Sequence, residues 1–185
     1  VVNSINEAIL MKEKFTEDYS IDNIYFLLES FLKKNIFEIE KDLKNFIKKI
    51  YIIFESDSFF VAKSSIKHNI KLINFNHSQL NDTLIEIRNQ FNKHSPGYKT
   101  IHMVIDRYIV NGSVQKTLPE NIDSENLVIQ VNFICLEDKI IDNFKKIFSK
   151  YQISISKIFS YEYLKNLNNY SSENIAKIAN DNLNG

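Results

Sequence analysis

The chain has 185 residues, and its 23 basic side chains balance 23 acidic ones, so the formal net charge is zero. Hydrophobic residues make up 44% of the sequence, which excludes an intrinsically disordered protein and suits one domain with a small appendage. Because zero net charge gives no general attraction to polyanions, we predict no nucleic-acid partner. The lack of a bilayer-length apolar run predicts no direct membrane insertion.

The cysteine content and the apolar runs of the sequence indicate the cellular compartment of the protein. Cys135 is the only cysteine, and its setting "VNFICLED" predicts a buried core residue and no disulfide, which fits the reducing cytoplasm. No apolar run approaches the roughly 20 residues that span a bilayer, and the first residues lack the order of an export signal. Since the chain starts with Val1, we expect a piece of a longer protein.

Apolar and polar residues alternate loosely over 6–16, which predicts an edge strand. The pattern that follows in the N-terminal third is helical. Ser20 is a candidate N-cap. Helical spacing continues from there to about residue 47, and the sequence leaves open whether a break near Asn35 separates two helices. The apolar positions are Ile21, Ile24, Tyr25, Leu28, Leu32, Ile36, Ile39, Leu43, Phe46 and Ile47.

The middle of the chain predicts strands around a helix. The β-branched and aromatic run 50–56 predicts a buried strand, and we expect 58–66 to pair with it. Next comes a helical stripe, capped by Asn76 or Ser78 and ended by Ser95-Pro96-Gly97. Its apolar members are Leu80, Leu84, Ile87 and Phe91.

The last part adds strands at 100–105, 126–136 and 153–160 and a helix over 137–151. Between the first two strands, Asn111-Gly112 predicts a two-residue hairpin turn, because both positions of that turn need positive φ. The sum is an α+β fold: a mainly antiparallel sheet with helices on one face, preceded by an N-terminal helical segment. We predict an N-terminal segment at 1–47, a domain at 48–165 and a polar tail at 166–185.

Catalytic and metal-binding patterns are missing from the sequence. His68, His77, His94 and His102 have no metal-ligand spacing. Regular strand geometry puts His102 and Asp106 about 13 Å apart, too far for a catalytic pair. The acids Glu137 and Asp138 suit a helix N-terminus, and no glycine-rich phosphate loop occurs. We therefore predict no enzyme activity, no metal and no cofactor in this chain.

An ordered set of segments nevertheless resembles a known family. The set is "YIIFES…FFVAKSSI", a capped helix, "TIHMVIDRYIVNGSVQKTLP" and then "NLVIQVNFICLEDKIIDNFKKIFSKYQISISKIFS". It resembles the SHS2 subdomain, called 1C, of the bacterial actin-like division protein FtsA. Ile101 to Ile105 match the family's His-containing strand, Tyr108 to Val110 its hairpin, and Pro119 the proline that follows. Asp106 departs from the family, which has a proline there, and Asn111 replaces an aspartate.

The resemblance implies a role in protein contacts. It implies that residues 1–47 are a remnant of the 1A subdomain, and that ATP binding would require subdomains outside this chain. Expected partners are FtsZ, FtsN-like division proteins and further copies of the chain, at the division site. We expect Arg107, Tyr108, Asn111 and Gly112 to contact them. Two alternatives stay open: a subdomain of a PilM-like pilus or secretion ATPase, and a stand-alone ligand-binding protein with a pocket near His102.

Overall fold

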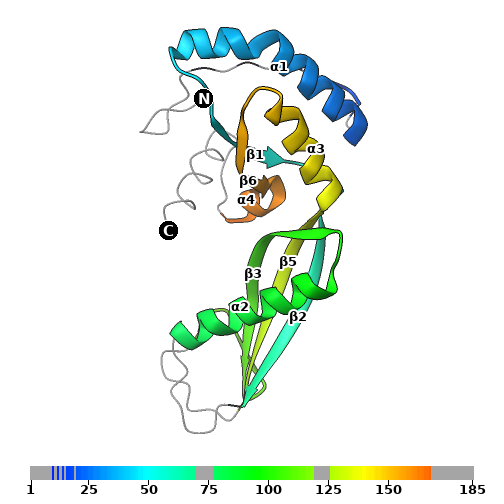
Figure 1. The fold of residues 1–185 in the computed structure, drawn as a ribbon. Helices are drawn as coiled ribbons and strands as arrows, with labels where there is room; N and C mark the ends of the chain where they lie inside the picture. Colours follow the sequence, from blue (N-terminus) through cyan, green and yellow to red (C-terminus); the bar gives the residue numbers. More distant parts are fainter. Residues whose placement is uncertain are drawn as a thin grey trace. The chain divides into compact units, whose positions relative to one another are not determined.

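The computed structural model describes residues 10, 12, 14, 16–18, 20–69, 77–118 and 126–167. The elements in chain order are α1 (Ile21–Leu43), β1 (Lys49–Phe54), β2 (Phe60–Asn69), α2 (His77–His94), β3 (Tyr98–Val110), β4 (Ser113–Gln115), β5 (Asn126–Glu137), α3 (Asp138–Ser149), β6 (Ser154–Ser160) and α4 (Tyr161–Leu167) (Figure 1). The predicted α+β class, with an antiparallel sheet and an N-terminal helix, is confirmed.

Two compact units make up the chain. Unit 1 comprises Val1–Glu55 and Ile140–Gly185, and unit 2 comprises Ser56–Lys139. Unit 2 is therefore an insertion between two sequence segments of unit 1. The boundaries predicted at 48 and 165 do not coincide with those of the units, because the predicted domain includes β1 and β6 of unit 1.

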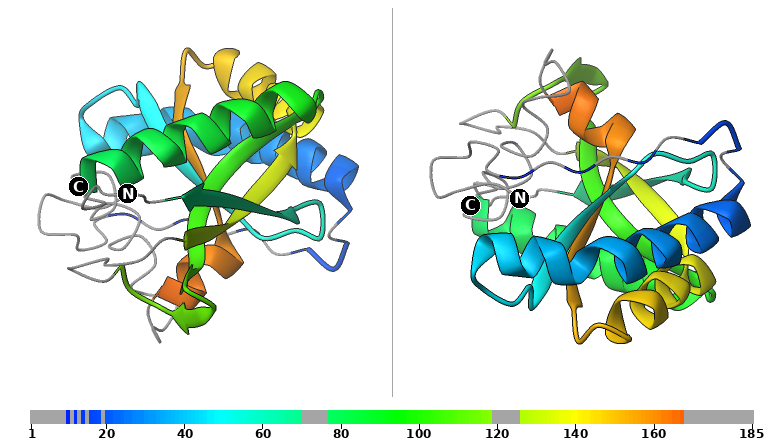
Figure 2. Two further views of the ribbon diagram at one scale, coloured as in Figure 1. Left: turned by 90° about the horizontal axis from the view of Figure 1, so that it is seen from below. Right: turned by 90° about the horizontal axis from the view of Figure 1, so that it is seen from above.

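Unit 2 is a four-stranded antiparallel sheet in the order β2-β5-β3-β4. The helix α2 crosses one face of this sheet (Figures 1 and 2). Burial alternates along β5, and the buried positions face α2. They are Leu127, Ile129, Val131, Phe133 and Cys135. Alternation of this kind leaves the other face of the sheet without a helix from unit 2.

The expected pairing of 58–66 with the strand at 50–56 is wrong. β2 pairs with β5 along its whole length, from Phe60↔Cys135 to Asn69↔Asn126. β1 pairs in parallel with β6 instead. The ladder of β2 and β5 extends over ten residue pairs, which gives more hydrogen bonds than the six residues of β1 could offer β2.

The predicted hairpin is confirmed. Asn111 has φ 47° and Gly112 has φ 84°, and the flanking pair is Val110↔Ser113. Two β-bulges precede the hairpin in β3, one between Thr100 and His102 and the other between Ile105 and Arg107. Each bulge changes which face the following side chains occupy.

In unit 1, α1 is a single helix of 23 residues without a break at Asn35. It ends at Leu43, so the predicted continuation to residue 47 is wrong. Lys44 adopts the left-handed conformation, and the Lys44 and Asn45 amides donate to the carbonyls of Lys41 and Glu40, an arrangement that terminates helices. Glycine is the usual residue at this left-handed position. Because position 44 is a lysine, the sequence gave no signal that the helix ends there.

The core of unit 1 joins α1, α3, β1 and β6. One cluster of its buried members consists of Leu32, Ile147, Phe148 and Ile153. The ring of Phe144 makes edge-to-face contacts with Tyr25 of α1 and Phe54 of β1, at centroid distances of 5.4 and 5.2 Å. The predicted apolar stripe of α3 is thus confirmed, although Tyr151 lies beyond the last helical residue, Ser149.

Some predictions concern residues outside the described part of the chain. The tail from 168 onward, Pro119, and most of the predicted edge strand at 6–16 belong to this group. Ser20 does precede α1, but its side chain makes no capping hydrogen bond. In the described part of the chain, no helix combines the length and the apolar character needed to cross a membrane.

Candidate interaction surface

The face of the unit 2 sheet opposite α2 is the candidate site. We call it the open face, and it is formed by the side chains that alternate with the core positions. Strand register puts them in rows across the sheet. The rows are Val61–Ile134–His102, Lys63–Asn132–Val104, Ser65–Gln130–Arg107 and Lys67–Val128–Ile109, the last of which continues to Val114 of β4.

Exposure on the open face is greatest on its outer strands. Val61 is 54% exposed and Val114 is 61% exposed, and Lys63, Ser65 and Lys67 are also exposed. Val128, Gln130, Asn132 and Ile134 of β5 are half-buried on the open face, whereas Leu136 of β5 and His102 of β3, at one end of this face, are buried. The open face therefore offers apolar surface, two amides and basic groups together.

The fixed charge of the open face is basic. Lys63 and Lys67 lie on β2, two rows apart, and Arg107 lies between their rows on β3. The Arg107 Nε donates to Oδ2 of Asp106 at 2.6 Å, so part of the guanidinium charge is balanced locally. Asp106 occupies the second bulge, where it has no partner residue in the ladder. Lys63, Lys67 and Arg107 are all exposed, so these charges are available to solvent or to a partner.

The structure separates the four residues predicted to contact partners. Arg107 is exposed, and Asn111 and Gly112 form the exposed tip of the hairpin. Tyr108, however, is 6% exposed and belongs to the core beneath α2, so its ring does not reach the surface. The bulge at Asp106 causes this, because Arg107 pairs with Gln130 and the next residue turns to the core face beside Ile129.

The sequence analysis did not identify Lys63 and Lys67 as parts of the candidate surface. The alternation of "SFFVAKSSIKHN" does place them on one face of a strand. That this strand forms an edge of the sheet depends on pairing between distant segments, and no local pattern reveals it.

The three histidines whose side chains the structure describes, His68, His94 and His102, do not form a shared site. His102 is buried at 7% exposure, and the carboxylate of Asp106 contacts Arg107. His68 contacts the Thr83 hydroxyl at 3.0 Å, and the His94 ring contacts the Gln90 carbonyl at 2.8 Å. Within the described ranges, no group of three or more histidine, cysteine or acidic residues is arranged to hold a metal ion.

Burial changes the acidity of two core groups in unit 2. It raises the pKa of the Cys135 thiol, an effect that a hydrogen bond with Thr100 partly offsets, and it raises the pKa of the Tyr108 hydroxyl. Both groups are neutral over the physiological range. Cys135 is fully buried, as predicted, and its position in the core fits a packing role better than a nucleophilic one.

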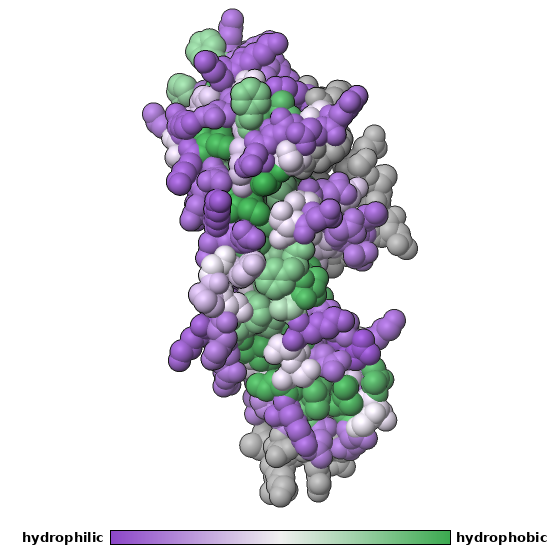
Figure 3. All heavy atoms as spheres, turned by 90° about the vertical axis from the view of Figure 1, so that its right-hand side faces the viewer, coloured by the Kyte–Doolittle hydropathy of each residue, from purple (hydrophilic) through white to green (hydrophobic). Residues whose placement is uncertain are grey.

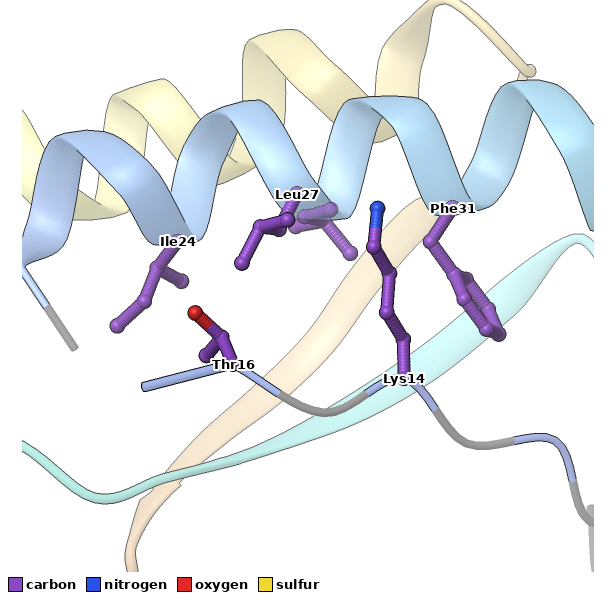
Figure 4. Close-up of a pocket in the computed structure, with 6 residues that line it drawn as sticks. Lys14, Thr16, Ile24, Leu27 and Phe31 are labelled. Atoms are coloured by element: carbon purple, nitrogen blue, oxygen red, sulfur yellow. The ribbon is translucent and has the colours of Figure 1, made fainter. Parts of the chain in front are cut away.

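A shallow groove lies in unit 1 along α1 (Figure 4). Its volume is about 310 Å³, near the lower limit for small-molecule sites. The walls are Ile24, Leu27, Leu28 and Phe31 of α1, with Lys14 and Thr16 opposite them. Lys14 Nζ donates to Ser30 Oγ at 3.4 Å, which links the Lys14 side chain to α1. The groove is apolar and belongs to unit 1, whereas the ligand-binding alternative expected a pocket near His102.

Hydrophobic and hydrophilic side chains are interspersed on the surface of the protein. Figure 3 faces the side on which β2 lies in Figure 1, and hydrophobic residues reach the surface there between hydrophilic ones. Mixed surfaces of this type are common at protein–protein contacts, where an apolar centre is surrounded by polar groups.

No protein-family model matches the chain, and no curated protein matches it. The resemblance to FtsA therefore depends on the ordered segments quoted above.

Proposed function

We propose that the chain is a non-catalytic interaction and assembly module of an FtsA-like cell-division protein. It acts in the cytoplasm, peripherally at the division site, through self-assembly and by recruiting division proteins such as FtsZ or FtsN. The chain itself needs no cofactor for this role.

The observation that supports the proposal best is the asymmetry of the unit 2 sheet. One face is covered by α2, and the open face carries Lys63, Lys67 and Arg107 beside half-buried apolar side chains. A further support is the order of elements β2, α2, β3, β4 and β5, which is the order expected from the resemblance. Exposed arginine and apolar side chains on one rigid sheet suit recognition of another protein.

The direct test is binding of the purified chain to FtsZ and to the cytoplasmic segment of FtsN from the same organism. Biolayer interferometry measures these contacts, and sedimentation velocity measures self-association. We expect at least one of the three contacts to occur and to weaken in Arg107→Glu. Arg88→Glu, an exposed arginine on α2, is the control with the same charge change.

Two results would contradict the proposal. One is that none of the three contacts is detected at tens of micromolar protein. The other is a clear thermal shift on titration with ATP, because a nucleotide site in this chain is incompatible with a purely assembling module.

A further inference from the structure

β2 forms one edge of the unit 2 sheet (Figure 1). Its ladder with β5 uses one side of the strand, and no strand in the described part of the chain pairs with the other side. Alternate residues of an edge strand direct their N–H and C=O groups away from the sheet, where an additional strand can bond to them. β2 is ten residues long, enough for a complete additional ladder.

The side chains of β2 on the open face carry a definite pattern. Val61, Lys63, Ser65 and Lys67 follow one another at every second position, and all four are exposed. The edge therefore presents an apolar group, a positive charge, a small polar group and a second positive charge in order. Phe60 turns to the other face and packs edge-to-face on Tyr98 at 4.7 Å, so it helps to hold the start of the strand in place.

This pattern disfavours a second copy of β2 as the added strand. Antiparallel pairing of two copies centred on Ser65 puts Lys63 directly opposite Lys67, twice, and like charges in that position are destabilising. Parallel pairing of two copies in register places each lysine beside the same lysine of the other copy, which is destabilising for the same reason. A shift by one residue would bring the open-face side chains of one copy to the opposite face of the other. A shift by two residues, centred on Ser64, separates the lysines but puts Ser65 and Val61 opposite them, so neither lysine gains an ion pair. An acidic strand, in contrast, complements both lysines.

We infer that the free edge of β2 binds an extended acidic segment of a partner protein as an additional antiparallel strand. The segment has the pattern acid-x-x-x-acid-x-apolar: its acids lie opposite Lys67 and Lys63, and its apolar residue lies opposite Val61. This inference rests on the proposed function, because it names the partner chemistry of the same interaction surface. Backbone hydrogen bonds supply the docking, and the two cross-strand ion pairs supply the register.

The probe is the fluorescently labelled peptide Thr-Glu-Thr-Thr-Thr-Glu-Thr-Val-Thr, titrated with the full chain and followed by fluorescence anisotropy. Its control, Thr-Glu-Thr-Thr-Thr-Thr-Glu-Val-Thr, has the same composition but places the two glutamates on opposite faces of a strand. We expect the first peptide to bind on the order of 10-fold more tightly. Equal affinities, or no binding of either peptide at millimolar concentration, would overturn the inference.

Backbone pairing is tested with two N-methylated forms of the first peptide. In one form the methyl groups are on the residues that carry the acids and the valine, and in the other they are on the intervening residues. Only one of these sets can face β2, so we expect one form to bind and the other to fail. If both forms bind equally, the contact is electrostatic only and the added strand is excluded. This comparison uses the unaltered protein and does not depend on the folding of a variant.

The register is tested in the protein by K63E/K67E, with K116E/K139E as the control of equal charge change. Lys116 and Lys139 are exposed residues of unit 2 that lie outside β2. We expect the first variant to weaken peptide binding on the order of 10-fold and the control to leave it near the original value. Equal weakening by both variants would show that net charge, and not the β2 lysines, attracts the peptide.

The same variants separate the inference from the proposed function. If FtsZ or FtsN binds and K63E/K67E binds equally well, the proposed function stands and the β2 edge is excluded. If the acidic peptide binds with the expected pattern but no division protein does, the edge site stands and the proposed function fails.

Discussion

Phe91 of α2 and Phe133 of β5 stack face to face, with ring centroids 4.2 Å apart and planes inclined by 6°. Phe133 is fully buried on β5, an inner strand of the sheet, so this contact fixes the C-terminal half of α2 on the strands. The pair stabilises the layer that leaves the opposite face of the sheet open.

The first prediction is that Phe91→Ala destabilises unit 2 by about 2–4 kcal/mol, because it removes buried aromatic surface and leaves Phe133 without its stacking partner. Urea unfolding followed by circular dichroism measures the change. Lys93→Ala, in the same helix turn but exposed, is the control and should differ little from the original chain. Equal midpoints for the two variants would show that the stack contributes nothing.

The second prediction concerns the hairpin. Gly112 has φ 84°, and a Cβ added there would meet no atom within 4 Å, so Gly112→Ala is penalised by backbone conformation alone. We expect a loss of about 1 kcal/mol in the free energy of unfolding. Asn111→Gly, which suits the same positive φ, should be close to neutral. A neutral result for Gly112→Ala would contradict the two-residue turn.

The third prediction is a gain in stability. Lys44 has φ 53° after the last residue of α1, a conformation that glycine adopts without a steric penalty. Lys44→Gly should therefore stabilise unit 1 by about 0.5–1 kcal/mol. Lys41→Gly, inside the last helical turn, should instead cost about 1 kcal/mol. Thermal unfolding of both variants checks the opposite signs; a loss in both would refute the assigned helix end.

The fourth prediction is a dependence on alkaline pH. Burial raises the pKa of Cys135 above its ordinary value of 9.0 in the folded chain, so the unfolded chain releases the thiol proton first. This contribution to stability is complete below about pH 9 and is lost as pH rises further. We expect the slope of stability against pH to be less negative above pH 9 in Cys135→Ala, measured by urea unfolding at several pH values. In the original chain, a thiol reagent at pH 8 should react with Cys135 only after unfolding.

Local signals in the sequence predicted the elements whose causes are local. Asn111-Gly112 determines its own turn through positive φ, and the stripe of Ile140, Ile141, Phe144, Ile147 and Phe148 determines the buried face of α3. The paired acids at 137–138 were also interpreted correctly in part, since Asp138 is the first residue of α3 while Glu137 still belongs to β5.

Strand partners and strand faces were less predictable. Nothing within 50–66 reveals that β1 pairs with β6 and β2 with β5, because those partners are far away in the sequence. Tyr108 was expected at the surface, and a single bulge residue, Asp106, determines that it lies in the core. For the same reason, the sequence identified Arg107 but not the lysines of β2 as parts of one surface.

The insertion of unit 2 between β1 and α3 has a consequence for the order of folding. β1 and β6 can pair only after the whole intervening chain has closed into a loop, and loop closure costs more entropy as the loop lengthens. Pairing of Phe60 with Cys135 brings the two ends of that loop together. Early formation of the β2–β5 ladder therefore shortens the effective loop, and we expect the parallel pair to assemble last in refolding kinetics.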